Sequence, residues 1–290
     1  MLVDAIRAEG FRLSKNRTAL FWSVLFAPIL TLVIGVITSF VLKSHESRLM
    51  ADTEVPPKLR EMLTSTPLDI GHALVAGASG LANPLVLAFV VIGAATIYAG
   101  DYRWETWRLI SARNSRPNLL LGKLAVVAVL GLTAMLLMLL SVLAENLVRA
   151  AVFERTLTFS MTGEMFGHFL GLAGLGWLRI LQFTMIGMLT AVVTRSLLAA
   201  LFVPLVLGVA QALSPQMLGS MGVLPDAWLS ILVNPGAGTD AIAAMIQGGP
   251  GAAALPDGLV MKAWLSLGLW TLVPLAGALA WFRKQDLSKE

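Results

Sequence analysis

The sequence predicts an all-α integral membrane protein with six transmembrane helices. Of its 290 residues, 57% are hydrophobic and only 13% are charged, whereas a soluble domain has about 25% charged residues. The mean hydropathy is +0.80, and the apolar residues fall into long runs. A spanning helix needs about 20 largely apolar residues. The runs that meet or approach this length are 19–42, 83–99, 119–143, 170–193, 197–213 and 259–282.

Residues 1–18 precede the first run and have the pattern of an amphipathic helix. Val3, Ile6, Gly10 and Leu13 share one face of such a helix, and charged residues occupy the others. This arrangement is typical of a helix that lies on a membrane surface. We expect 1–18 to form an N-terminal interface helix that leads directly into the first span.

Residues 214–258 precede the last run and contain no Lys or Arg. Their apolar pieces, 217–224 and 228–233, are too short to cross a membrane. Proline and glycine interrupt the segment at Pro215, Pro225, Pro235 and Pro250. We therefore expect short re-entrant helices in the outer leaflet, within one transmembrane domain that covers residues 1–290.

The distribution of positive charge predicts the orientation. Six spans place both termini on one side, and the positive-inside rule assigns that side to the cytoplasm if it holds more Lys and Arg. With cytoplasmic termini, thirteen basic residues lie inside and seven lie outside. We expect both termini in the cytoplasm and a bacterial inner (plasma) membrane. Asp4 and Glu9 within the basic N-terminal region argue against a cleavable signal.

The residue types exclude several kinds of chemistry. The chain has no cysteine, and its histidines, His45, His72 and His168, have no second histidine at ligand spacing. Gly122-Lys123 is followed by leucine, so no phosphate-binding loop is present. We predict no catalytic, cofactor-binding or metal-binding residue in this chain, and no enzymatic activity of its own.

Two classes of partner or mechanism are also disfavoured. The net charge of +4 comes without a basic stripe interleaved with aromatic residues, so we expect no nucleic-acid partner. Proton-coupled carriers hold carboxylates inside their spans. Here Asp101, Glu145 and Asp286 stand at or beyond the ends of the apolar runs, which argues against an ion-coupled carrier.

Residues 100–117, between the second and third runs, are rich in Arg and Trp and have a helical pattern. Arg and Trp are enriched at binding hot spots, but they also form the aromatic belt and positive flank of many membrane proteins. Composition leaves both interpretations open. The candidate contact residues are Arg103, Trp104, Glu105, Trp107, Arg108, Arg113 and Arg116.

The same segment resembles the pattern of type 2 ATP-binding-cassette (ABC) exporter permeases. In that family an acidic residue and a Gly-Thr pair precede a basic turn and a Gly-Lys that opens the third span. The matching stretches are GDYRWETWR at 100–108, SRP at 115–117 and LGK at 121–123. Glu105 stands where the family usually has glycine. The layout of the whole chain is also similar.

The resemblance implies a permease subunit without its own ATPase domain, paired with a second copy or a related permease. Separate cytoplasmic ABC ATPase subunits would bind ATP and Mg²⁺ and would contact 100–117 as a coupling helix and 1–18 as an interface helix. The few charges within the spans favour an amphiphilic, lipid-linked or peptide substrate. The alternative is a non-transporting membrane scaffold or regulatory subunit that recruits a cytoplasmic partner through the same segment.

Arg179 is the one charged residue in the middle of an apolar run, since Lys123 and Lys262 stand near the starts of theirs. A charge at that depth costs about 2.5 kcal/mol or more unless it is compensated. Arg179 is therefore a candidate contact for an anionic substrate or a membrane-lipid headgroup. Alternatively, its side chain extends to the outer surface or pairs with Glu145 or Glu164.

Overall fold

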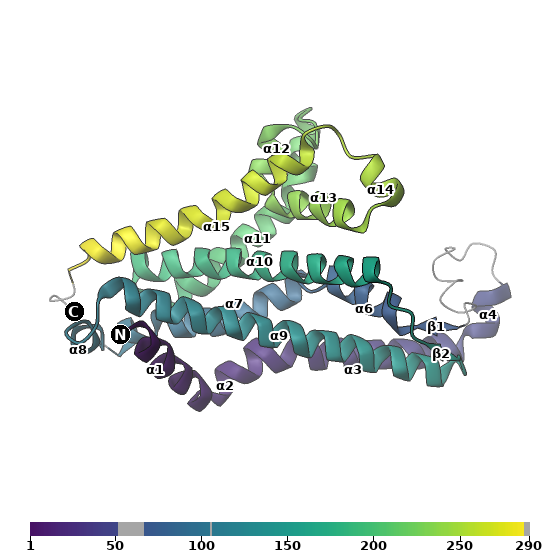
Figure 1. Cartoon of the computed structure of the whole chain (residues 1–290), viewed down its shortest axis with the longest axis horizontal. Helices are drawn as coiled ribbons and strands as arrows, with labels where there is room; N and C mark the ends of the chain where they lie inside the picture. Colours follow the sequence, from purple (N-terminus) through teal and green to yellow (C-terminus); the bar gives the residue numbers. More distant parts are fainter. Residues whose placement is uncertain (52–66, 105, 287–290) are drawn as a thin grey trace.

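The computed structural model describes residues 1–51, 67–104 and 106–286 of an elongated helical bundle (Figure 1). The all-α membrane fold is confirmed, because six helical segments that overlap the predicted runs are long and apolar enough to cross a membrane. The first span, Arg17–Ser44, consists of α2 (Arg17–Leu20), the π-helical turn η1 (Phe21–Leu25) and α3 (Phe26–Ser44). The others are α7 (Pro84–Arg103), α9 (Arg116–Val152), α10 (Gly163–Thr194), α11 (Leu197–Ser220) and α15 (Leu259–Lys284).

Short elements mark the two ends of the bundle. At one end, here called the terminal end, lie α1 (Leu2–Lys15), α8 (Trp107–Ser111) and the last turn of α15 (Figure 1). At the opposite end, the far end, lie α4 (Glu46–Ala51) and the two-residue strands β1 (Leu68–Asp69) and β2 (Leu157–Thr158). Four further short helices are α6 (Ile70–Ser79), α12 (Trp228–Val233), α13 (Pro235–Gln247) and α14 (Gly249–Ala253).

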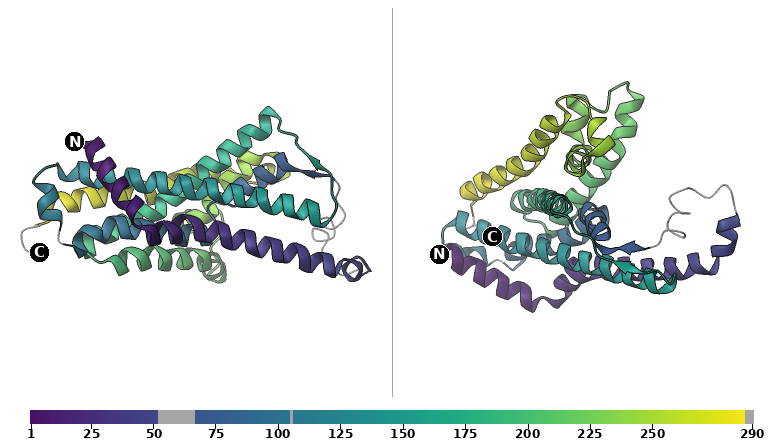
Figure 2. Two further views of the ribbon diagram at one scale, coloured as in Figure 1. Left: turned by 90° about the horizontal axis from the view of Figure 1, so that it is seen from below. Right: turned by 45° about the vertical axis from the view of Figure 1, so that its right-hand side comes forward.

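Helix α10 lies at the centre of the bundle and packs against α15, α7, α11 and α6 (Figure 1). Helix α9 packs against α3 and α1, which lie on the side of the bundle away from α15 (Figure 2). The outer faces of the peripheral spans carry large apolar side chains without cover, which fits contact with lipid chains. Examples with more than half of the residue exposed are Ile34, Phe40, Val206 and Leu272.

Several spans begin at a local capping signal. A polar side chain just before the helix accepts a hydrogen bond from an amide of the first turn, and Pro is compatible with the first helical position. Asn83 Oδ1 accepts from the Val86 amide at 3.0 Å, and Pro84 occupies the first position of α7, at the start of the predicted run 83–99. The hydroxyls of Thr162 and Ser196 cap α10 and α11 in the same way.

Pro215 does not end a helix, contrary to the expectation of a break there. Helix α11 continues through it to Ser220. A proline within a helix leaves the carbonyl four residues earlier without its amide partner, and here that carbonyl belongs to Gln211. Ser214 Oγ donates to the Gln211 carbonyl at 2.8 Å, so the local sequence supplies the missing donor. Breaks do occur at Asn234-Pro235 and Gly248, which bound α13.

A small parallel pairing of β1 with β2 joins distant segments at the far end. Beside it, Asp69 accepts hydrogen bonds from Ser160 Oγ at 2.6 Å, from the His72 amide at 2.9 Å and from Thr158 Oγ1 at 3.3 Å. Because these bonds favour the ionised form, they hold the pKa of the Asp69 carboxyl below its ordinary value. The pairing is the sole sheet in the ranges described.

Gly93 lets α7 approach its neighbours closely, and we predict that Gly93→Val destabilises the fold. A Cβ atom at this position would lie 2.6 Å from Leu130 Cδ2 and 2.8 Å from Ser23 Cβ. Overpacking of this kind costs about 1–3 kcal/mol. Thermal unfolding in mild detergent would therefore show a lower midpoint. Gly268→Val is the matched control, because a Cβ there meets no atom within 4 Å; an equal effect of both changes would contradict the prediction.

Candidate functional site

Helix α1 packs closely against the start of α9. A Cβ atom at Gly122 would lie 2.8 Å from Ala5 Cβ, so only glycine permits this approach. The buried face of α1 differs in part from the predicted one. Ala5 and Glu9 are buried, whereas Val3 is 57% exposed. The buried face of the interface helix thus includes a carboxylate.

That carboxylate belongs to a group of four ionisable side chains, here called the charge cluster: Glu9, Asp101 and Lys123, which are buried, and Arg12, which is 46% exposed. Lys123 Nζ lies 2.6 Å from Asp101 Oδ2 and 3.1 Å from Glu9 Oε1. Arg12 Nη1 lies 2.7 Å from Asp101 Oδ1 and 3.2 Å from Glu9 Oε1. The Lys123 and Asp101 side chains are each 1% exposed. Two positive and two negative groups therefore neutralise one another, with Lys123, Asp101 and Glu9 away from water and Arg12 at its edge.

The charge cluster joins α1, the end of α7 and the start of α9. Lys123 Nζ also donates to the Ile97 carbonyl at 2.8 Å, and Thr106 Oγ1 donates to Asp101 Oδ1 at 2.5 Å. A buried ion pair is costly to break, because the remaining partner is left charged and unsolvated. The cluster therefore restricts independent movement of these three segments.

Trp107, predicted as a surface contact, lies instead in the core, and this expectation is corrected. Its side chain is 0% exposed. Its ring packs 4.6 Å from the Phe282 ring and 5.4 Å from the Tyr102 ring, measured between centroids, and Lys123 Nζ lies 5.2 Å from it. An aromatic ring at this position fills the space between α7, α9 and α15, so it stabilises the terminal end and is not available to a partner.

Arg116 is likewise committed to an internal contact. Its Nη1 donates to the carbonyls of Phe282, Arg283 and Gln285, at 3.1, 3.1 and 2.6 Å. The Phe282 and Arg283 carbonyls belong to the last turn of α15 and the Gln285 carbonyl follows it, so they have no amide partner within the helix. A cation there also interacts favourably with the negative end of the helix dipole. Arg116 thus fixes the end of α15 to the start of α9.

The other candidate contact residues divide into two groups. Trp104 is 71% exposed, and the Arg103 guanidinium carbon lies 5.3 Å from the centre of its ring. Arg113 is also exposed. Glu105 and the side chain of Arg108 lie outside the described residues. The exposed part of 100–117 that the structure describes therefore centres on Arg103, Trp104 and Arg113.

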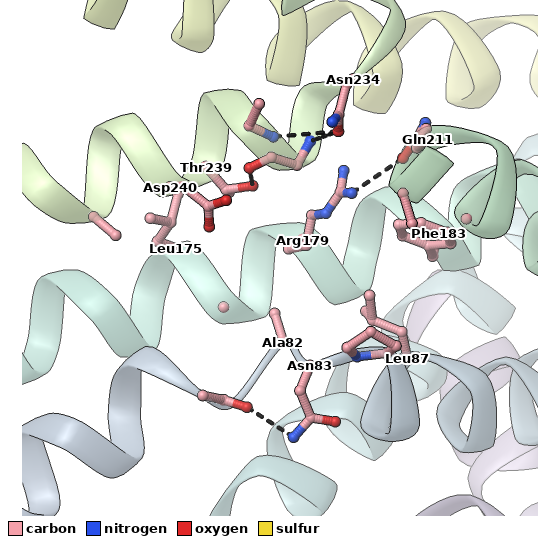
Figure 3. A pocket seen from close by; sticks show the side chains of 18 of the residues that line it. Ala82, Asn83, Leu87, Leu175, Arg179, Phe183, Gln211, Asn234, Thr239 and Asp240 are labelled. Atoms are coloured by element: carbon pink, nitrogen blue, oxygen red, sulfur yellow. Dashed lines mark hydrogen bonds between the residues drawn. The ribbon is translucent and has the colours of Figure 1, made fainter. Parts of the chain in front are cut away.

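A second candidate site is a cavity of 760 Å³ between α7, α10, α11 and α13 (Figure 3). Its wall is largely apolar, with Leu87, Leu172, Leu175 and Val209 among the lining residues. The polar side chains that line it are Ser79, Asn83, Arg179, Gln211, Asn234, Thr239 and Asp240.

Arg179 projects into this cavity and is 7% exposed (Figure 3). Nη1 donates to Gln182 Oε1 at 2.5 Å and Nη2 to Gln211 Oε1 at 3.0 Å, and the guanidinium carbon lies 4.8 Å from the centre of the Phe183 ring. It therefore neither extends to the surface nor pairs with Glu145 or Glu164. Glu145 pairs instead with Arg149.

Nothing in the sequence analysis associated Asp240 with Arg179. Asp240 lies in α13, outside the six apolar runs, yet it lines the same cavity. The two groups are near enough to interact electrostatically, although no carboxylate oxygen of the described residues lies within 4.0 Å of Arg179. The Asn-Pro that opens α13 is the signal that could have placed Asp240 in the second turn of a helix.

We predict that Lys123→Met destabilises α1 and the terminal end, because it leaves the Glu9 and Asp101 carboxylates buried with only Arg12 as counter-charge. Breaking a buried pair costs about 3–5 kcal/mol. The measurements are the thermal unfolding midpoint in detergent and the rate of trypsin cleavage within α1. Lys43→Met is the control, because its pair with Glu46 is partly exposed and worth about 1 kcal/mol at most. Equal responses would show that the cluster does not hold α1.

Among the residues described, no group of three or more His, Cys, Asp or Glu side chains is arranged to hold a metal ion. Comparisons with protein-family models, curated proteins and solved structures found no match to this chain. The charge cluster, the exposed residues of 100–117 and the Arg179 cavity are therefore the features from which function is inferred.

Proposed function

We propose that this chain is the permease subunit of an ATP-driven exporter of the type 2 ABC class. Separate cytoplasmic ATPase subunits would bind ATP and Mg²⁺, and a second permease copy or a related permease would complete the membrane part. The exported molecule would be an amphiphilic, lipid-linked or peptide substrate. Both termini would face the cytoplasm of a bacterial cell, with the chain in the inner membrane.

The observation that carries this proposal is the charge cluster. The resemblance assigns ATPase contact to 1–18 and 100–117, and Glu9 and Arg12 from the first segment meet Asp101 and Thr106 from the second. Lys123 connects both to α9. Movement of a docked ATPase would therefore reach two spans, α7 and α9, as movement of one rigid body.

Helix α15 is joined to the same unit. Arg116 binds the Phe282 and Arg283 carbonyls of its last turn, and Tyr102 Oη donates to Gln285 Oε1 at 2.9 Å. Trp107 packs against the ring of Phe282 in the last turn of α15. The terminal ends of three spans are thus tied to segment 100–117, whose exposed side chains Arg103 and Trp104 are suited to contact a partner.

We predict that the double change Arg103→Glu and Trp104→Ala removes ATPase binding and leaves the fold intact. Both side chains are exposed, so folding does not depend on them, whereas a hot-spot pair contributes about 2 kcal/mol or more, roughly 30-fold in affinity. The measurement is recovery of a co-purifying ATPase in mild detergent, at about equal copy number for the unchanged protein.

The matched control is Lys262→Glu with Trp228→Ala. It removes a second cation–aromatic pair, in which Lys262 Nζ lies 5.8 Å from the Trp228 ring centre. Lys262 is in the first turn of α15 and Trp228 is in α12. The ATPase should be recovered in full with this variant. Undiminished recovery with the first variant would contradict the docking assignment. A co-purifying partner without ATPase activity would support the scaffold alternative.

The orientation has a direct test, because the chain contains no cysteine. We predict that an impermeant thiol reagent labels Ser47→Cys, but not Ser115→Cys, in intact cells. Ser47 lies at the far end and Ser115 at the terminal end, and both are exposed. Permeabilised cells provide the control, since both positions should then react. Labelling of Ser115→Cys alone in intact cells would reverse the orientation.

A further inference from the structure

Arg179 is a buried cation with unused hydrogen-bonding capacity. A guanidinium has five N–H donors, and Arg179 makes two hydrogen bonds, both to neutral amide oxygens. No carboxylate among the described residues pairs with it at ion-pair distance. A buried charge in an apolar setting is costly until an opposite charge reaches it. The cavity therefore presents a cation suited to an anionic ligand.

The N-terminus of α13 adds positive potential at the same place. A Cβ atom at Gly236 would lie 3.1 Å from Arg179 Nη2, so the first turn of α13 almost touches the guanidinium. Asn234 Oδ1 accepts from the amides of Gly236 and Ala237, at 3.0 and 3.2 Å. The positive end of the helix dipole and the Arg179 cation thus act on one part of the cavity.

Asp240 places a negative charge on a different part of the same wall. It lies one turn further along α13, and its carboxylate faces the space between α13 and α10 (Figure 3). It is beyond ion-pair distance of Arg179 but interacts with it electrostatically. A simple anion would be attracted by Arg179 and repelled by Asp240. A ligand with an anionic group for Arg179 and a separate cationic group for Asp240 would be attracted by both residues.

The rest of the wall is apolar and adjoins the lipid-facing side of α11. Leu205, Gly208 and Val209 of α11 line the cavity, and Val209 is 60% exposed. A volume of 760 Å³ is within the range of ligand-binding cavities. The chemistry of the wall thus matches a charged headgroup joined to a hydrocarbon chain.

We propose that the Arg179 cavity binds a zwitterionic amphiphile of the phosphoethanolamine type. The phosphate lies against Arg179 and the start of α13, the ammonium lies against Asp240, and the acyl chain follows the apolar wall. The inference rests on the proposed function in one respect, that this ligand is the substrate of the exporter. Binding itself needs neither ATP nor a partner chain.

The test compares two lysolipids with the same acyl chain, lysophosphatidylethanolamine and lysophosphatidylglycerol, for binding to the purified full chain in nonionic detergent. Native mass spectrometry gives both dissociation constants. We expect the unchanged protein to bind the zwitterionic lipid at least about 10-fold more tightly. Asp240→Asn should remove that preference, because it weakens binding of the ammonium and relieves repulsion of the anion. Arg179→Gln should weaken both lipids about 10-fold or more.

Asp257→Asn is the matched control, an exposed carboxylate outside the cavity, and it should leave both dissociation constants unchanged. Asp240 lies at the surface of the cavity and is itself exposed, so Asp240→Asn tests the proposal even if Arg179→Gln fails to fold. Equal binding of the two lipids by the unchanged protein would overturn it. So would an Asp240→Asn variant that keeps the original preference.

A binding measurement with phosphoethanolamine, which has no acyl chain, shows whether the cavity binds a lipid or a small soluble zwitterion. We expect it to bind at least about 10-fold more weakly than the lysolipid. Equal affinity would assign the cavity to a small soluble zwitterion and overturn the amphiphile. Because binding is measured without an ATPase, failure here leaves the exporter proposal standing, and loss of the ATPase interaction leaves this result unaffected.

Discussion

The pairing of Lys123 with Asp101 governs the arrangement of the terminal end. Both side chains are 1% exposed, and in an apolar setting no water replaces a lost partner. Lys123 therefore requires acceptors from the chain itself, and it obtains them from Glu9 of α1, Asp101 of α7 and the Ile97 carbonyl. The absence of a side chain at Gly122 brings α1 near enough for Glu9 to take part. Charge and shape at two consecutive residues of α9 thus determine where the interface helix lies.

Features that depend on neighbours along the chain were predicted from the sequence. The six spans follow from apolar runs, and α7 begins within one residue of the start of the predicted run 83–99. Features that depend on contacts between distant segments were not predicted. Trp104 and Trp107 are three residues apart and chemically alike, but one is exposed and the other fills a space bounded by Tyr102 and Phe282. Composition cannot separate them, because Phe282 lies on the last span.

The residues of the candidate cavity also come from distant segments, and only one of them was predicted from the sequence. Arg179 stood out because a cation within an apolar run is visible in the sequence. Its neutral partners Gln182 and Gln211 carry no such signal, and Asp240 lies in a helix too short to cross a membrane. Pro215 shows that even a local signal is insufficient when another side chain compensates for it. There the Ser214 hydroxyl replaces the missing amide, and α11 continues.

Helix α7 physically connects the two sites. Leu87, in its first turn, lines the Arg179 cavity, and Asp101, in its last turn, belongs to the charge cluster. Its 20 residues span about 30 Å at 1.5 Å per residue. A helix is stiff along its axis, so displacement of one end moves the other. The opposite wall is also connected to the terminal end, because α13 packs on α15 and Arg116 holds the last turn of α15. In the proposed exporter, a force applied at 100–117 would therefore act on both walls of the cavity through α7 and α15. In that proposal, ATPase movement at the terminal end would alter the shape of the cavity without contact between the two sites.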